Sequence, residues 1–253
     1  MQVQLSAVII TFNEEKNIER CILSAQKVAD EVLVVDSFST DQTKSICEQL
    51  GVRFIEHAFE GHIQQKNWAR DQAKFNCVLS LDADEALDEN LVTEIMKVKE
   101  NWTFNAYKMN RLTNYCGKWI HHTSWYPDTK IRLFDRRVGM WDGLNPHDEY
   151  RVPKGEKVEH LKGDILHYSF YTRAEHLAQI EKFSTIGARA LFEKGKRSNW
   201  VLVFIKPVAR FIKNYFIRLG FLDGTEGFAI SRLSAYANYL KYKKLIGLQK
   251  EVD

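Results

Sequence analysis

The sequence predicts an α/β fold, a mostly parallel sheet flanked by helices, followed by a mainly helical C-terminal extension. Two observations predict the sheet. Short apolar runs alternate with segments of helical period over the first hundred residues, and these runs are almost unbroken by polar residues. A β-α-β order implies parallel strands joined by crossover helices, and parallel strands that are buried on both faces read as continuous apolar runs. With 253 residues, 45% of them hydrophobic, the chain has enough apolar side chains to bury such a core.

The expected elements follow in chain order. Strands are expected at residues 6–10, 31–35, 53–57 and 77–81, and helices within residues 11–28, 43–50, 62–73 and 89–98. Residues 106–137 change to extended, aromatic-rich segments, which predicts a mixed extension of the sheet with long loops. We expect LNPHDEY at 144–150 to lie in a loop, DILHYSF at 164–170 to form a short strand, and the chain from Arg173 onward to be mostly helical.

Composition and charge narrow the class of protein. A net charge of +3 is too small to indicate a nucleic-acid partner, and none is expected. Four widely spaced cysteines without a C-x-x-C pair favour free thiols in a reducing cytosol. The N-terminus lacks the pattern of a secretory signal, and no run approaches the ~18 apolar residues of a membrane span. These features predict a cytoplasmic location.

Three acidic motifs follow three of the predicted strands. They are TFNEE after the first strand, DSFSTD after the second, and DADE after the strand at Cys77. Ligands of open parallel sheets bind at the carboxyl ends of the strands, so these motifs should converge on one rim. The sequence therefore predicts a ligand site there.

The DADE motif indicates a divalent cation. Asp82 and Asp84 are two residues apart, so in an extended backbone both carboxylates point the same way. Two carboxylates that share a space repel each other unless a cation compensates, and Mg²⁺ or Mn²⁺ accepts oxygen ligands from both protein and phosphate. The alternative is a solvated helix start, which explains Asp88 and Glu89 better than it explains Asp82 and Asp84.

Four ordered motifs together carry a family resemblance. VIITFNEEKNIERCILS, VLVVDSFSTDQT, QQKNWA and LSLDADE resemble family 2 glycosyltransferases with the GT-A fold, most closely the bacterial lipopolysaccharide-core transferases of the β-1,4-glucosyltransferase type. The resemblance continues through KIRLFDRR, HDEY and GDILHYSF. It implies a GT-A transferase domain at residues 1–172 and a helical, basic-amphipathic extension at residues 173–253.

The resemblance also implies a reaction. Such an enzyme would move a sugar, with inversion, from a nucleotide-diphosphate donor such as a UDP-hexose to a lipid-linked or lipopolysaccharide-core acceptor. Its cofactor would be Mg²⁺ or Mn²⁺. A polyprenyl-phosphate glycosyltransferase and a non-catalytic nucleotide-sugar-binding protein are the alternatives. Nucleotidyltransferases and Rossmann dehydrogenases are disfavoured, because TFNEE occupies the place of their glycine-rich phosphate loop.

The resemblance implies a role for individual residues of this sequence. Asp36 would face the base, and Glu14 or Glu15 would lie near the ribose. Lys66 would approach the nucleotide or its diphosphate. The nucleotide-sugar set is Thr11, Asn13, Glu14, Glu15, Asp36, Lys66, Asp82 and Arg132, and the metal pair is Asp82 and Asp84.

Several of these positions have a second interpretation. Arg132 suits phosphate oxygens, but its alternation with apolar neighbours also fits the exposed side of a strand. Lys66 also fits an exposed helical lysine. For His167, a structural role is favoured over an approach to the metal.

The catalytic base is expected in HDEY. Inverting transfer needs a carboxylate within hydrogen-bond reach of the acceptor hydroxyl. The family places an acid directly after the histidine, which favours Asp148, while Glu149 stays open and a polar surface turn is the alternative for both.

A basic segment lies near the C-terminus. No carboxylate occurs between Lys194 and Leu222, where seven lysines and arginines are present. Pro207 suits the first turn of a helix. An apolar stripe follows at helical spacing, with basic residues opposite it: Val208, Phe211, Ile212, Tyr215, Phe216 and Leu219 against Lys206, Arg210 and Lys213. This helix either lies on an anionic membrane surface, on the inner face of the cytoplasmic membrane, or packs on the protein's own core. A lipid-linked acceptor favours the first interpretation.

Overall fold

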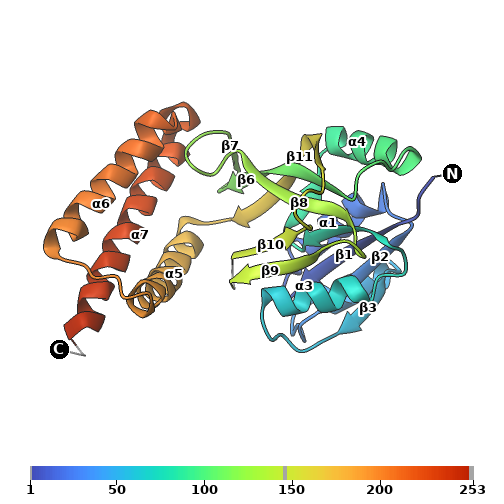
Figure 1. Ribbon diagram of the computed structural model, residues 1–253, viewed down its shortest axis with the longest axis horizontal. Helices are drawn as coiled ribbons and strands as arrows, with labels where there is room; N and C mark the ends of the chain where they lie inside the picture. Colours follow the sequence, from blue (N-terminus) through green and yellow to red (C-terminus); the bar gives the residue numbers. More distant parts are fainter. Residues whose placement is uncertain (1, 145–146, 251–253) are drawn as a thin grey trace. The chain divides into compact units, whose positions relative to one another are not determined.

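A computed structural model describes residues 2–144 and 147–250 of the chain (Figure 1). The chain divides into two compact units. Unit 1 comprises Met1–Arg111 and Asp128–Tyr168, and unit 2 comprises Leu112–Pro127 and Ser169–Asp253. The boundary between residues 172 and 173 that the sequence suggests stays a prediction.

The four predicted parallel strands are confirmed. They are β1 (Leu5–Thr11), β2 (Glu31–Asp36), β3 (Arg53–Glu56) and β4 (Cys77–Asp82), and they pair in parallel in the order β3-β2-β1-β4. In this register Thr11 lies beside Asp36, and Ile10 lies beside Asp82. The carboxyl ends of the three central strands therefore meet at one edge, as the acidic motifs predict.

The sheet continues beyond β4 with antiparallel pairs. Its order runs on through β8 (Asp128–Asp135), β6 (Ala106–Tyr115), β11 (Val158–Phe170) and β5 (Glu85–Leu87). Strand β8 is antiparallel to both β4 and β6, and β5 is antiparallel to β11. The predicted mixed extension of the sheet is confirmed. Long strands, β6 and β8, occupy much of the segment in which long loops were expected.

Helices cover both faces of the parallel strands in unit 1. They are α1 (Ile18–Gln26), α2 (Thr43–Gln49), α3 (His62–Asp71) and α4 (Glu89–Glu100). Ile9 of β1 packs in one core cluster with residues of α1 and α4, whereas its neighbour Val8 packs in another with Ala69 of α3 and Phe134 of β8. Because successive side chains of a strand point to opposite faces, burial on both sides explains the unbroken apolar runs.

The loop predicted at residues 144–150 is wrong for its described residues. The structure has a hairpin there, β9 (Met140–Leu144) and β10 (His147–Arg151), with Trp141 opposite Tyr150. Tyr150 is buried and stacks on Phe134 with ring centroids 3.5 Å apart. These aromatic contacts hold β10 as a strand, which places Asp148 and Glu149 on opposite faces.

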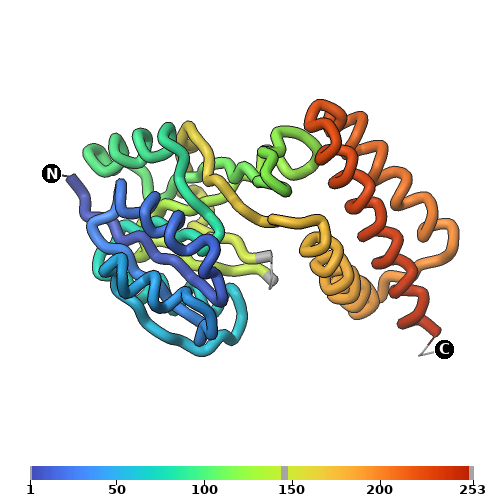
Figure 2. The backbone as a smooth tube through the Cα atoms, turned by 180° about the vertical axis from the view of Figure 1, so that it is seen from behind, coloured from blue at the N-terminus to red at the C-terminus, as the bar shows by residue number. Residues whose placement is uncertain are grey.

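Unit 2 is built mainly from helices, as predicted from Arg173 onward. They are α5 (Arg173–Glu193), α6 (Trp200–Ile212) and α7 (Gly224–Lys250), together with a π-helical turn at Lys213–Ile217 and a 3₁₀ turn at Gly220–Asp223. Helix α6 runs beside α7 in both views (Figures 1 and 2). The short strand β7 (Lys118–Ile120) also belongs to this unit and pairs with the end of β6.

The predicted start of the basic helix is wrong. Pro207 lies inside α6 rather than in its first turn. The helix begins earlier because the side chain of Asn199 accepts a hydrogen bond from the backbone N–H of Leu202 at 3.0 Å. The apolar segment 200–205 therefore joins the same helix as the predicted stripe.

The buried side chain of His176 predicts that the folded chain loses stability in acid. Burial lowers the pKa of His176 to about 4, and its Nδ1 lies 3.1 Å from the hydroxyl of Tyr115. Since an unfolded histidine titrates near 6.5, the unfolded chain binds this proton first, and stability falls as the pH drops from about 6.5 to about 4. We expect a loss of about 3 kcal/mol from this group, measured by urea unfolding across that range.

A matched pair of variants isolates the effect. His176→Phe should flatten the pH slope of the unfolding free energy, whatever its offset at pH 7. His160→Phe, at an exposed position of β11, should leave that slope as in the parent chain. Equal slopes in the parent chain and in His176→Phe would contradict the assignment.

Candidate active site

Two loops at the carboxyl edge of the sheet are tied together by the predicted nucleotide residues. Asn13, which adopts a left-handed backbone with φ of 54°, donates its N–H to the hydroxyl of Ser39 at 2.7 Å. Its side-chain oxygen accepts a hydrogen bond from the N–H of Thr40 at 2.8 Å. Asn13 therefore fixes the β1–α1 loop against the β2–α2 loop. Asn tolerates the left-handed backbone at this position better than most residues do.

Asp36 and Thr11 lie at the strand ends beneath these loops. Asp36 is buried and accepts hydrogen bonds from both the N–H and the hydroxyl of Ser39. The hydroxyl oxygen of Thr11 is buried and has no hydrogen-bond partner among the described residues. Both predicted positions therefore lie at the edge where β1 and β2 end.

Glu14 and Glu15 have different surroundings. Glu15 is exposed, and its carboxylate accepts a hydrogen bond from the N–H of Gln42 at 3.0 Å. Burial raises the pKa of Glu14, and the negative charges of Asp84 and Asp41 raise it further. The two neighbouring glutamates therefore differ in environment, because Glu14 is half-buried near other carboxylates and Glu15 is exposed.

Lys66 of α3 lies between two of the predicted carboxylates. Its Nζ is 2.9 Å from Oδ1 of Asp82 and 2.7 Å from Oδ2 of Asp148, although 82 residues separate Lys66 from Asp148. The side chain is only 3% exposed, so the alternative of a surface lysine is wrong. Lys66 also lies over the ring of Trp141, 4.6 Å from its centroid.

Arg132 holds the other oxygen of Asp82. Its Nη2 is 2.7 Å from Oδ2 of Asp82 and 2.8 Å from Oε1 of Glu85, and its side chain is buried. The exposed-strand alternative for Arg132 is therefore wrong. Although burial alone would raise the pKa of Asp82, the charges of Arg132 and Lys66 hold it well below its usual value.

The sequence reasoning missed the ion pairs behind Arg132. Glu85 is fully buried, its Oε2 accepts the N–H of Asp82 at 3.0 Å, and its Oε1 also lies 3.4 Å from Nη1 of Arg111. Arg111 in turn contacts Asp128 at 2.7 Å. The available signal was the alternation of Asp128 and Arg132 in β8, where charged residues recur on one face of a strand.

Asp84 and Asp82 have different protein neighbours, because the backbone between them is a turn and not the extended segment that the sequence predicts. The shared cation stays a prediction. Strand β4 ends at Asp82, and a turn follows at Ala83 and Asp84. Oδ2 of Asp84 lies 3.1 Å from Nε2 of His167 on β11. The turn therefore directs the two carboxylates to different neighbours. Asp88 caps helix α4, as the alternative interpretation of a helix start proposed, and its side chain accepts a hydrogen bond from the N–H of Leu91 at 2.7 Å.

The two candidate bases are separated by the hairpin. The Asp148 side chain is 11% exposed and lies against Lys66, whereas that of Glu149 is 67% exposed and is 3.9 Å from Arg151. Of the two, only Asp148 belongs to the ion cluster that contains Asp82. Trp141 is buried in the core, and its ring lies beside the Lys66 ammonium of this cluster.

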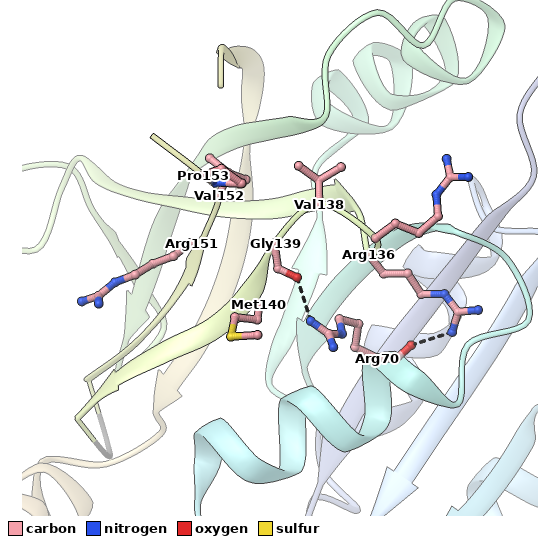
Figure 3. Close-up of a pocket in the computed structure, with 9 residues that line it drawn as sticks. Arg70, Arg136, Val138, Gly139, Met140, Arg151, Val152 and Pro153 are labelled. Carbon is pink, nitrogen blue, oxygen red and sulfur yellow. Dashed lines mark hydrogen bonds between the residues drawn. The ribbon is translucent and has the colours of Figure 1, made fainter. Parts of the chain in front are cut away.

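A pocket of about 410 Å³ lies elsewhere in unit 1 and contains none of the predicted site residues (Figure 3). Arginines line it, but several already bind protein groups: Arg70 donates to the carbonyl of Gly139 at 2.7 Å, and Arg136 donates to the carbonyl of Arg70 at 3.2 Å. The candidate active site is therefore the ion cluster and the rim, and not this pocket.

Replacing Lys66 tests the energetic role of the cluster. Lys66→Met removes the cation between Asp82 and Asp148, and breaking a buried ion pair costs about 3 kcal/mol or more. We expect a loss of that size in urea unfolding at pH 7. Lys27→Met is the control, because Lys27 pairs with Glu89 at the surface, where such pairs contribute less than about 1 kcal/mol. Equal effects of both variants would contradict the assigned role of Lys66.

Comparison with known proteins identifies the family of the chain. The family model for glycosyl transferase family 2 matches residues 6–163. An uncharacterized glycosyltransferase of Rickettsia bellii is 31% identical over 96% of this chain and 86% of its own length. The lipopolysaccharide core biosynthesis glycosyltransferase LpsC of Rhizobium meliloti is 27% identical over 96% and 92%. Among solved structures, S. aureus TarS is similar with a TM-score of 0.47 and 14% identity, over 99% of this chain and 92% of that chain. The chain belongs to glycosyltransferase family 2.

Proposed function

We propose that the protein is an inverting hexosyltransferase. It moves a sugar from a nucleotide-diphosphate donor, of which UDP-hexose is the first candidate, to a lipid-linked or lipopolysaccharide-core acceptor. The observation that carries the proposal is the contact of Asp148 with Lys66, which joins β10 to the acidic edge where β4 ends. The similarity to a lipopolysaccharide core glycosyltransferase supports the class of acceptor.

In this proposal each part of the site has a chemical role. Asp148 accepts the proton of the acceptor hydroxyl as that oxygen attacks the anomeric carbon. Lys66 and Arg132 supply positive charge next to Asp82, where the negative charge of a leaving diphosphate develops. Thr11, Asn13, Glu14, Glu15 and Asp36 form the nucleotide side of the same edge.

Asp84 and His167 fit a divalent cation that is shared with the substrate. In residues 2–144 and 147–250 no group of three His, Cys, Asp or Glu side chains could hold a metal by itself. Mg²⁺ is usually bound by one or two carboxylates together with substrate phosphates, and Asp84 with His167 supplies a carboxylate and an imidazole 3.1 Å apart. Such an ion neutralises charge on the leaving diphosphate. The Arg132 and Lys66 contacts make Asp82 a weaker candidate ligand than Asp84.

The acceptor places the proposed reaction at the inner face of the cytoplasmic membrane. None of the described helices is long and apolar enough to cross a bilayer. We therefore propose peripheral contact with an anionic membrane surface.

A panel of nucleotide-sugars with Mn²⁺ or Mg²⁺ tests the function. The expected result is transfer of radiolabelled sugar to lipid-linked saccharide, with donor hydrolysis as the basal activity. Labelling of polyprenyl phosphate instead would establish the alternative acceptor. Donor binding without hydrolysis or transfer would identify a non-catalytic binding protein.

The choice of base is tested by two neighbouring substitutions. Asp148→Asn should lower the transfer rate by a factor of about 10² to 10⁴, because the acceptor proton loses its base, while UDP binding persists. Glu149→Gln should keep the rate within a few-fold, because its side chain is exposed on the other face of β10. The reverse ranking in a steady-state assay would refute the assignment of Asp148.

The metal assignment is tested by binding rather than by turnover. Asp84→Asn should weaken Mn²⁺-dependent UDP binding by about tenfold or more in calorimetric titrations, because a carboxylate ligand becomes an amide. Asp88→Asn is the control, since Asn caps helix α4 as well as Asp does. UDP affinity of the parent chain that does not depend on Mn²⁺ would rule out the shared cation.

A further inference from the structure

Helix α6 exposes an apolar face to solvent. Six apolar side chains of this helix are between 45% and 61% exposed: Trp200, Val201, Phe204, Ile205, Val208 and Ile212. They recur at i, i+1, i+4, i+5, i+8 and i+12, so they share one side of the helix. In most soluble domains an apolar surface of this width would be buried against a partner.

The helix is also attached to its own unit. Val203 is fully buried, and the ring of Phe211 lies 5.9 Å from that of Phe228 on α7. The predicted stripe is therefore divided: Phe211 and Tyr215 turn toward α7, whereas Val208 and Ile212 face solvent. Packing on the protein's own core accounts for part of the stripe and leaves the rest uncovered.

The apolar exposure continues past the end of α6. Through the π-helical and 3₁₀ turns, five more apolar side chains are 44% to 69% exposed: Phe216, Ile217, Leu219, Phe221 and Leu222. Monomeric soluble proteins rarely expose a large contiguous apolar patch unless it binds something. We call residues 200–222 with these exposed side chains the α6 face.

The charge around the α6 face has one sign. No carboxylate occurs between Lys194 and Leu222, and seven lysines and arginines do. Burial lowers the pKa of Lys241 on α7, and the charges of Arg210 and Lys206 lower it further, so the cations of the two helices are close. A helix is about 10–12 Å wide, and the Debye length is about 10 Å at 0.1 M salt. The cations therefore act on any surface that the apolar side contacts.

We propose that the α6 face is an interfacial membrane-binding surface that inserts its apolar side chains into the head-group region of an anionic bilayer. A basic helix with a wide apolar side and Trp or Phe residues on it is typical of helices that lie in the plane of a bilayer. Anionic lipids add attraction for each lysine or arginine near the surface. The inference deepens the proposed function by naming its membrane contact, and it rests on that function only for the presence of a lipid-linked acceptor.

A second copy of the chain is the less suitable occupant. An isologous contact through the α6 face would bring two carboxylate-free, basic segments together, and like charges across an interface oppose association. An anionic bilayer complements both the apolar area and the charge. Lipid is therefore the proposed occupant of the α6 face.

Vesicle flotation with the full chain tests the proposal. The chain should float with vesicles that contain phosphatidylglycerol at low salt, and it should float less with pure phosphatidylcholine or at high salt. The double substitution Phe204→Glu and Val208→Glu should reduce vesicle partitioning by at least about tenfold. Both positions are exposed, so circular dichroism should show the fold unchanged.

A single substitution in unit 1 controls for placing a glutamate at an exposed apolar position. Leu23 of α1 is 47% exposed and lies in unit 1, so Leu23→Glu should leave partitioning unchanged. Trp200 supplies a second readout: vesicles should shift the fluorescence of the parent chain to the blue, and Trp200→Phe should lose most of that shift while still floating.

Several outcomes would overturn the proposal. They are no retention of the parent chain on anionic vesicles at low salt, retention that Phe204→Glu with Val208→Glu does not reduce, or a self-associated parent chain that the double variant converts to monomers without any vesicle binding. Hydrolysis of the donor without vesicles should be the same in parent and double variant. A negative sugar panel with positive flotation would therefore refute the proposed function alone, and the converse result would refute the membrane surface alone.

Discussion

The structure of the site depends on placing one almost fully buried ammonium group between two carboxylates. Lys66 lies against both Asp82 and Asp148, and an unpaired charge at such a position is costly. This requirement couples three elements, because α3 carries the lysine, β4 ends at one acid and β10 carries the other. The hairpin therefore cannot move away from the sheet edge without leaving at least one charge uncompensated.

The same network explains why the two acids of the DADE motif differ. Asp82 is held by Lys66 and Arg132, so its charge is already balanced by protein cations. Asp84 follows in a turn and contacts His167. One acid is therefore balanced by two protein cations, whereas the other lies beside an imidazole.

Much of the fold was predictable, because buried parallel strands leave an unmistakable apolar pattern. The segments at β1, β2 and β4 are such runs, and the acids after them were expected at one edge. The hairpin at β9 and β10 was not predicted, because its strand character comes from the contact of Tyr150 with Phe134 on β8. A contact between distant segments has no local signature, so HDEY resembled a polar loop.

The sequence indicates charged residues of the candidate site but not how they pair. Family motifs indicated Lys66, Arg132 and Asp148 as charged residues of interest, yet they could not reveal that these side chains neutralise one another and Asp82 in pairs. The reason is geometric: a turn of two residues after β4 separates Asp84 from Asp82, and spacing along the chain assumes an extended backbone that the turn removes.

The basic helix shows a further limit of prediction from sequence. Periodicity identified an apolar stripe and the cations opposite it, and both are present in α6 and the turn that follows. Periodicity cannot tell what covers a stripe, because a side that packs on a neighbouring helix and a side that contacts lipid have the same composition. Burial separates them: Val203 is enclosed, whereas Phe204 and Val208 are more than half exposed. The proposed lipid contact rests on the uncovered part of the stripe, which lies in a segment without a carboxylate.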